Sequence, residues 1–165
     1  MRVIIMRHGE SYNNILGMIS REDYENKREF EPKMSEIGNQ SCIQMGQKMK
    51  ELGFEFSKIL CSAHRRAILS AKLLREGFMG DESEGQPPIQ LFVKAHEYQG
   101  VHMKGKTYPG LNMKEIKEIV PDISADPNHE ISDEKGWFER ESMETGDQLT
   151  ERVKEVIRDL KEMHK

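Results

Sequence analysis

The chain has 165 residues, of which 36% are hydrophobic and 33% charged, and its formal net charge at pH 7 is −4. This length is typical of one domain, and no lysine and arginine run is long enough to follow a nucleic-acid backbone. No stretch approaches the roughly 18 apolar residues of a membrane span, and the N-terminus lacks the regions of a secretory signal. We therefore expect one soluble, cytoplasmic domain over residues 1–165 that binds neither nucleic acid nor membranes.

The first predicted element is a strand over residues 2–6, an apolar run that leads directly into a polar loop. The polar positions of that loop are Arg7, His8, Gly9, Glu10, Ser11 and Asn14. Open α/β sheets bind ligands at the carboxyl ends of their strands, where His8 could act as a nucleophile while Arg7 holds phosphoryl oxygens. A single His-Gly pair is also typical of an ordinary loop histidine, so the later segments must decide between the two interpretations.

A helix is predicted next, from an N-cap at Ser35 to Gly53. Its expected apolar face consists of Ile37, Cys42, Met45, Met49 and Leu52. A second short strand follows over residues 58–61. Because the chain has only two cysteines, we interpret Cys42 and Cys61 as reduced core residues rather than as a disulfide.

The second helix is predicted to begin at an N-cap, Ser62, and to end at Gly77. Its apolar stripe is Ala67, Ile68, Ala71 and Leu74. Arg65 and Arg66 stand at its start, near the sheet edge expected for His8, where the helix N-terminus adds donors for an anion. Adjacent arginines are often surface charges, but with His8 upstream a phosphate site is the better explanation.

A loop over residues 79–88 precedes a third strand, predicted over residues 89–93, which is followed by His96 and Glu97. Glu97 could protonate a leaving oxygen if burial raised its pKa, or it could be a solvated loop carboxylate. The alternation of strands and helices predicts an α/β fold with a mainly parallel sheet covered by helices.

The region over residues 98–136 is irregular apart from a short helix predicted near residues 112–119, and we expect it to be a lid over the site. Lys104, Lys106 and Tyr108 could meet an anionic substrate there, although such residues are more often solvated. A final helix is predicted over residues 146–164. Its apolar stripe is Leu149, Val153, Val156, Ile157, Leu160 and Met163.

Taken in order, these segments resemble the histidine phosphatase superfamily, also called the phosphoglycerate mutase-like family. The matching pieces are residues 7–11 with Asn14, residues 34–38 with Gln40, residues 62–71, and His96 and Glu97 with Gly100. The Gly136 and Trp137 region and residues 144–152 also resemble family members. The resemblance spans nearly the whole chain and implies a three-layer α/β/α fold of the phosphoglycerate mutase-like kind.

The resemblance also implies a role for each matching residue. His8 would accept the phosphoryl group, Arg7 and Arg66 would hold its oxygens, and Glu97 would donate the proton and then activate water. Ser11 and Asn14 would be lesser phosphate contacts. The implied activity is that of a metal-independent phosphoric monoester hydrolase that uses no cofactor, or of a phosphomutase, on a phosphorylated small molecule or a phosphoprotein.

The chain departs from the family pattern most strongly after its last predicted helix. Family members continue past the last helix into a central strand that carries a second catalytic histidine, and His164 does not match that residue. We therefore expect a C-terminally truncated fold. The chain could be a fragment, a split protein whose strand comes from a partner chain, or a degenerate member. The alternative function is then a weakly active or inactive phosphate-binding or assembly module.

Overall fold

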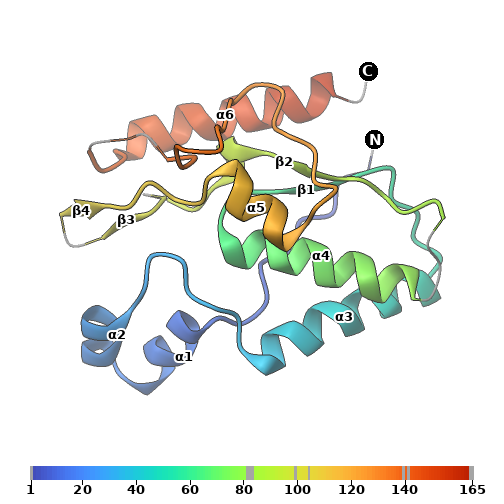
Figure 1. Ribbon diagram of the computed structural model, residues 1–165, viewed down its shortest axis with the longest axis horizontal. Helices are drawn as coiled ribbons and strands as arrows, with labels where there is room; N and C mark the ends of the chain where they lie inside the picture. The colour runs from blue at the N-terminus through green and yellow to red at the C-terminus, as the bar shows by residue number, and fades with distance from the viewer. Residues whose placement is uncertain are drawn as a thin grey trace.

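The computed structural model describes residues 2–80, 84–98, 100–103, 105–138, 140 and 142–163 (Figure 1). Lys104 and His164 lie outside the described residues. The helices of the described part are α1 (Tyr12–Ile19), α2 (Arg21–Lys27), α3 (Glu36–Glu51), α4 (Arg65–Met79), α5 (Met113–Ile119), α6 (Gly146–Glu162) and the 3-10 helix η1 (Val93–Ala95). The strands are β1 (Ile59–Cys61), β2 (Ile89–Leu91), β3 (His102–Met103) and β4 (Lys106–Thr107).

A small parallel sheet forms the middle of the fold. β1 pairs with β2 in parallel, with Ile59 opposite Ile89, and Ser124 bridges to the other edge of β2. In Figure 1, α6 lies on one side of this sheet and α4 and α3 lie on the other. β3 and β4 form a separate antiparallel hairpin. The predicted α/β class and parallel pairing are therefore present, but the sheet of the described residues is smaller than expected.

The first predicted strand is not formed. Residues 2–10 have no regular secondary structure, and Val3, Ile4 and Ile5 are 47%, 41% and 92% exposed. A strand needs a neighbouring backbone to accept its hydrogen bonds, and none of the described residues pairs with this segment. Within the described part of the chain, β1 likewise has β2 as its one strand neighbour.

The core lies between α4, the β1–β2 sheet and the segment that carries α5. Its fully buried centre includes Ile68, Ile89, Leu91, Ile116 and Trp137. Ile116 lies within the predicted lid and Trp137 directly follows it, so part of residues 98–136 packs in the core. Movement of this region as a lid stays a prediction. Cys42 and Cys61 are buried and free, as predicted, and burial raises the pKa of the Cys61 thiol to about 12.

The helices α3 and α4 pack closely through glycines. A Cβ at Gly46 would clash with the Leu74 carbonyl oxygen, and one at Gly77 would clash with the Ile43 carbonyl oxygen. The predicted apolar face of α3 is therefore partly wrong. Its bulky members Ile37, Met45 and Leu52 are exposed, whereas Gly38, Cys42 and Gly46 are buried. Bulky apolar periodicity misses an interface that depends on small residues.

The stripe predicted for α6 is also only partly buried. Val153 and Ile157 are exposed, while Asp159 is the buried residue of this helix. The reason is that α6 packs against η1 through a polar face, and the described residues place nothing against Val153 or Ile157 that buries them. This polar contact between α6 and η1 also fixes the backbone shortly before Glu97, one of the residues predicted for the site.

Two of the predicted helix ends need correction. The helix α4 begins after His64 rather than after Ser62, and it continues past Gly77 to Met79. The cap at Ser35 is confirmed, because its side chain accepts the backbone N–H of Gly38. The helix expected near residues 112–119 is also present, and the side chain of Asn112 caps it by accepting the Glu115 N–H. None of the helices in the described residues is long and apolar enough to cross a membrane.

Candidate active site

A cavity of about 310 Å³ opens where the loop after residue 6, the start of α4 and the segment over residues 97–103 meet. The residues predicted for the site all line it, namely Arg7, His8, Ser11, Asn14, Arg66 and Glu97. They come from three parts of the chain that are far apart in sequence. The structure therefore brings the whole predicted set together at one opening.

His8 is half-buried, and its ring is fixed by its own loop. Nδ1 lies 2.7 Å from the carbonyl oxygen of Gly9. Because a carbonyl oxygen can only accept, Nδ1 carries the proton and Nε2 keeps its lone pair. Burial, together with the positive charges of Arg66 and Arg7, holds the pKa of His8 below its ordinary value. His8 is therefore neutral at pH 7, with Nε2 free to attack an electrophile.

The backbone next to His8 is held by α4. The Gly9 N–H donates to Ser70 Oγ at 3.0 Å, and Ser70 Oγ donates to the Arg66 carbonyl oxygen at 2.6 Å. A Cβ at Gly9 would lie 2.5 Å from Met34 Cε and 2.6 Å from the Gly38 carbonyl oxygen, so a larger residue does not fit. Ser70 lies within the matching residues 62–71 but was assigned no role, because a serine inside a helix does not indicate which backbone group it will contact.

The same loop is tied to the start of α3. The backbone N–H of Ser35 donates to the Glu10 carbonyl oxygen at 2.9 Å, and Ser35 Oγ donates to Glu10 Oε1 at 2.6 Å. Two residues further, the Tyr12 N–H donates to the Lys33 carbonyl oxygen at 3.0 Å. Residues 7–11 are thus positioned by α4, by the N-cap of α3 and by an isolated antiparallel bridge between Ser11 and Met34, rather than by the strand expected over residues 2–6.

Ser11 and Asn14 are hydrogen-bonded to each other at the start of α1. Asn14 Oδ1 accepts hydrogen bonds from the Ser11 N–H and from Ser11 Oγ, both at 2.9 Å. A backbone N–H can only donate, which fixes the side-chain oxygen of Asn14 on Ser11 and leaves its NH₂ group for another partner. Ser11 is 1% exposed. Of the two side chains, that of Asn14 therefore keeps N–H groups that can donate to an anion, and Ser11 orients it.

The two arginines differ in their surroundings. Arg66 is 7% exposed, and its guanidinium forms an ion pair with Glu97, whose side chain is 61% exposed. Arg7 is exposed, lines the cavity and makes no hydrogen bond or ion pair within the described residues. Glu97 is thus paired with the Arg66 guanidinium group that an incoming phosphate would need, whereas the guanidinium group of Arg7 is accessible to a phosphate.

Behind Arg66 lies a buried polar cluster that sequence reasoning missed. His64 is 2% exposed, and its Nδ1 lies 3.5 Å from Arg66 Nη1 and 3.4 Å from Glu31 Oε1. The other Glu31 oxygen accepts the Arg65 backbone N–H at 2.9 Å. The His64 ring packs edge-on against Trp137, with ring centroids 4.9 Å apart. This cluster limits the space in which the Arg66 side chain can move.

The outer wall of the cavity is aromatic and basic. Arg28 lies over the Tyr24 ring, 5.0 Å from its centroid, and Phe30 stacks on Tyr108 at 5.3 Å. Of the residues that could have met an anionic substrate, Tyr108 stacks on Phe30, and Lys106 is exposed in β4 and does not line the cavity. Among the described residues, no three His, Cys, Asp or Glu side chains are placed to hold a metal ion.

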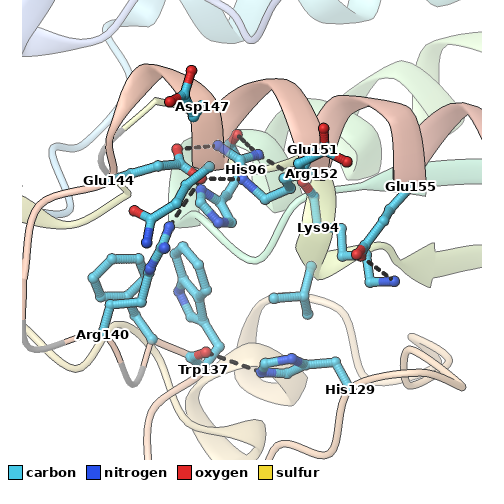
Figure 2. Close-up of a pocket in the computed structure, with 13 residues that line it drawn as sticks. Lys94, His96, His129, Trp137, Arg140, Glu144, Asp147, Glu151, Arg152 and Glu155 are labelled. Atoms are coloured by element: carbon cyan, nitrogen blue, oxygen red, sulfur yellow. Dashed lines mark hydrogen bonds and ion pairs between the residues drawn. The ribbon is translucent and has the colours of Figure 1, made fainter.

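A second cavity, of about 510 Å³, lies between α6, η1 and the segments around residues 129 and 137 (Figure 2). His96 lines this cavity, whereas the next residue, Glu97, lines the one that contains His8. The chain over residues 96–97 therefore forms part of the wall between the two cavities.

Comparisons with known proteins give two findings. The sequence model of the histidine phosphatase superfamily (branch 1) matches residues 3–165. The fold is similar to the crystal structure of the ecdysone phosphate phosphatase from Bombix mori in complex with tungstate, with a TM-score of 0.57 and 16% sequence identity. That match covers 93% of this chain and 53% of the other, so this chain spans about half the length of that phosphatase. No curated protein matches the chain.

Proposed function

Because this chain belongs to the histidine phosphatase superfamily (branch 1), we propose that it hydrolyses phosphoric monoesters through a phosphohistidine formed on His8. The observation that carries the proposal is the state of His8, whose Nδ1 is bonded to Gly9 and whose pKa is held low. An imidazole fixed in this tautomer has one free nucleophilic nitrogen, Nε2. Arg7 and Arg66 line the same cavity and can neutralise a phosphoryl group.

In the first step, His8 Nε2 attacks phosphorus and the bond to the ester oxygen breaks. The entering phosphate competes with Glu97 for Arg66 and releases the carboxylate, which takes up the proton of the monoanionic phosphoric monoester. Glu97 then passes this proton to the leaving oxygen. The alcohol then departs, and the positive charge of the phosphorylated ring is shared with its Nδ1–H, which stays on the Gly9 carbonyl oxygen. Phosphoryl transfer depends mainly on positioning and charge neutralisation, which the two arginines and Asn14 can provide.

In the second step, the Glu97 carboxylate takes a proton from water, and the hydroxide oxygen attacks the phosphohistidine. The bond between phosphorus and Nε2 breaks, and Glu97 gives its proton to the departing inorganic phosphate. Neutral His8 and the ion pair between Glu97 and Arg66 are thereby restored. The 61% exposure of the Glu97 side chain favours this step, because water reaches the carboxylate freely. The same exposure favours a phosphatase over a phosphomutase, which must keep water away from its phosphorylated intermediate. The substrate is a phosphorylated small molecule or a phosphoprotein.

The direct test is hydrolysis of p-nitrophenyl phosphate in the presence of a chelator. We expect turnover by the wild-type chain and a loss of about a thousandfold or more in kcat for His8→Asn, since the nucleophile is removed. Turnover that survives in His8→Asn would contradict the proposal. Lys48→Met, which changes an exposed charge on α3, is the matched control and should leave the rate unchanged.

A second candidate function is a phosphate-binding or assembly module whose missing strand comes from a partner chain. The observation in its favour is the exposed apolar run at residues 3–5 together with the edge of β1 that no described strand covers. Such a module would bind inorganic phosphate, measured as a rise in melting temperature that Arg66→Met abolishes, without hydrolysing p-nitrophenyl phosphate. Phosphate binding without turnover would favour the module, and turnover by the chain alone would favour the phosphatase.

A further inference from the structure

The segment that carries Glu97 is held from behind by α6. Arg152 Nη1 donates to the carbonyl oxygen of Lys94 at 2.8 Å and to that of His96 at 2.9 Å. These carbonyls stand at the end of η1, where the helix itself supplies no donor. The His96 carbonyl belongs to the peptide bond that joins His96 to Glu97, so one guanidinium group fixes the backbone directly before the proposed acid.

Arg152 is in turn fixed by a buried carboxylate. Its Nε donates to Glu144 Oε1 at 2.7 Å and its Nη2 to Glu144 Oε2 at 2.5 Å, a two-pronged contact that sets the plane of the guanidinium. The Glu144 side chain is 1% exposed, and Arg140 Nη1 adds a third hydrogen bond at 2.9 Å. Hydrogen bonds from Arg152 lower the pKa of Glu144 to about 2, so this carboxylate stays ionised throughout the neutral range.

Figure 2 shows this arrangement, with Glu144 and Arg152 beside His96 on one wall of the larger cavity. A second contact from α6 secures the same segment, since Lys94 Nζ forms ion pairs with Glu155 at 2.9 Å and Asp159 at 3.1 Å. The His96 ring packs against Trp137 at 5.4 Å, and its Nδ1 lies 2.8 Å from the Glu97 carbonyl oxygen. Residues 94–97 are therefore held on both their backbone and their side chains.

Buried ion pairs are weak evidence for stability, because removing charges from water costs much of what their attraction returns. The Arg152 and Glu144 pair is instead directed at two backbone carbonyls, those of Lys94 and His96, shortly before a residue of the candidate site. A displacement of about 1 Å at a reacting group can lower a rate about a hundredfold. The position of this pair therefore fits a role in aligning the site better than a role in general stability.

We infer that Arg152, oriented by Glu144, is a positioning residue that holds Glu97 where it can protonate the leaving oxygen. This inference rests on the proposed function, since it gives Glu97 the role of general acid. Arg152 itself touches no substrate. Its effect reaches the chemistry through the His96 carbonyl and the backbone of residues 96–97.

The test compares two substrates that differ in their need for a proton. The leaving group of p-nitrophenyl phosphate is weakly basic and departs without help, whereas that of phenyl phosphate is more basic and needs a general acid. The quantity measured is kcat/KM, which covers the steps up to departure of the alcohol. For Arg152→Met we expect a loss of about tenfold to a hundredfold on phenyl phosphate and of less than about threefold on p-nitrophenyl phosphate.

Three further variants complete the experiment. Glu97→Gln should give the same pattern, and adding Arg152→Met to it should cause no further loss on phenyl phosphate, because the acid is already absent. Arg152→Lys should restore part of the rate, since one ammonium can reach a carbonyl but cannot bridge both carbonyls and Glu144. Lys154→Met, on the same helix and paired only with exposed Glu151, is the matched control and should match the wild type.

Equal losses on the two esters in Arg152→Met would overturn the inference, because a general structural defect does not depend on the leaving group. Absence of turnover by the wild type would count against the proposed function instead. For that case, backbone amide hydrogen exchange provides a readout without turnover. Exchange over residues 93–98 should accelerate in Arg152→Met and not in Lys154→Met, and an unchanged rate there would also overturn the inference.

Discussion

Residues 7–11 are tied to α3 and α4 by hydrogen bonds, whereas residues 2–6, directly before them in the chain, are exposed and outside any strand. In residues 7–11 the backbone is hydrogen-bonded to neighbouring elements, for example through the Gly9 N–H, which donates to Ser70 Oγ. In residues 2–6, an apolar side chain as large as Ile5 is 92% exposed. The two segments are thus contiguous, but hydrogen bonds to other elements hold residues 7–11 in place, whereas residues 2–6 are exposed.

This difference shows which parts of the fold position the candidate site. A sheet strand usually fixes the loop that follows it, but here the loop is fixed by helices that pack on it from the side. The geometry of His8 should therefore depend strongly on contacts with α3 and α4 and only weakly on residues 2–6. The predictions below test this dependence, from the largest effect to the smallest.

Gly9→Ala should disturb the site most. The added Cβ would lie within 3 Å of Met34 Cε, the Gly38 carbonyl oxygen and Cys42 Sγ, so residues 7–11 must shift. We expect kcat/KM to fall about a hundredfold and the free energy of unfolding to fall by about 1–3 kcal/mol. Steady-state kinetics and denaturant titration measure the two quantities.

The control for this variant is Gly17→Ala on α1, where the new Cβ meets only the Tyr24 ring at 3.7 Å. Alanine is the better helix former, so this change should leave activity intact and raise stability by up to about 1 kcal/mol. A Gly9→Ala variant that is as active as Gly17→Ala would show that the close contacts of the loop do not matter.

Ser70→Ala should have the next largest effect. The change leaves the Gly9 N–H without its partner in a half-buried position, which should lower the free energy of unfolding by about 1–3 kcal/mol. We expect kcat/KM to fall about tenfold, because the His8 ring is anchored to the same residue. Ser70→Thr keeps the hydroxyl and should retain activity, and an equal loss in both variants would argue against the hydrogen bond as the cause.

The pH dependence of activity tests the electrostatics of His8. Its pKa is lowered by burial first and then by Arg66 and Arg7, so kcat/KM should stay high as the pH falls below 6.5 and be lost only as His8 takes up a proton. Arg7→Met removes one positive charge, which raises the pKa of His8 and should move the acid limb of the pH profile to higher pH. Arg2→Met, which changes an exposed residue in the weakly supported segment, should leave the limb in place.

The smallest effect is expected at Ile5. Because its side chain is almost fully exposed, Ile5→Ala should change the free energy of unfolding of the isolated chain by no more than about 0.5 kcal/mol. The same truncation at Ile68, which is 0% exposed, should cost about 2–5 kcal/mol. Comparable losses at the two positions in denaturant titrations would mean that residues 2–6 are buried in solution.

The grouping of the candidate site residues could be predicted because the segments that carry them match one family pattern in the same order along the chain. His8, Arg66 and Glu97 each follow a short apolar run, and the same sheet edge was expected to gather them. The parallel pairing of β1 with β2 followed from the same alternation of elements. These features depend on local sequence, which a single chain displays directly.

Other features depend on distant partners and could not be predicted. Residues 2–6 have the composition of a strand, but a strand forms only where a neighbouring backbone accepts its hydrogen bonds. The buried faces of α3 and α6 were misjudged for a related reason, since glycine contacts such as Gly46 and polar contacts such as Arg152 replace bulky apolar ones. Ser70 and His64 lie within the matching residues 62–71, but their partners are defined only once α4 lies beside the loop.

The most direct test of the central claim is detection of phosphate on His8. The chain is mixed with p-nitrophenyl phosphate, quenched in alkali, digested and examined by mass spectrometry, with His8→Asn as the control. The account predicts an acid-labile, alkali-stable phosphate on the peptide that contains His8 and none in the control. Phosphate found on another residue, or hydrolysis that proceeds without any phosphohistidine on His8, would contradict it.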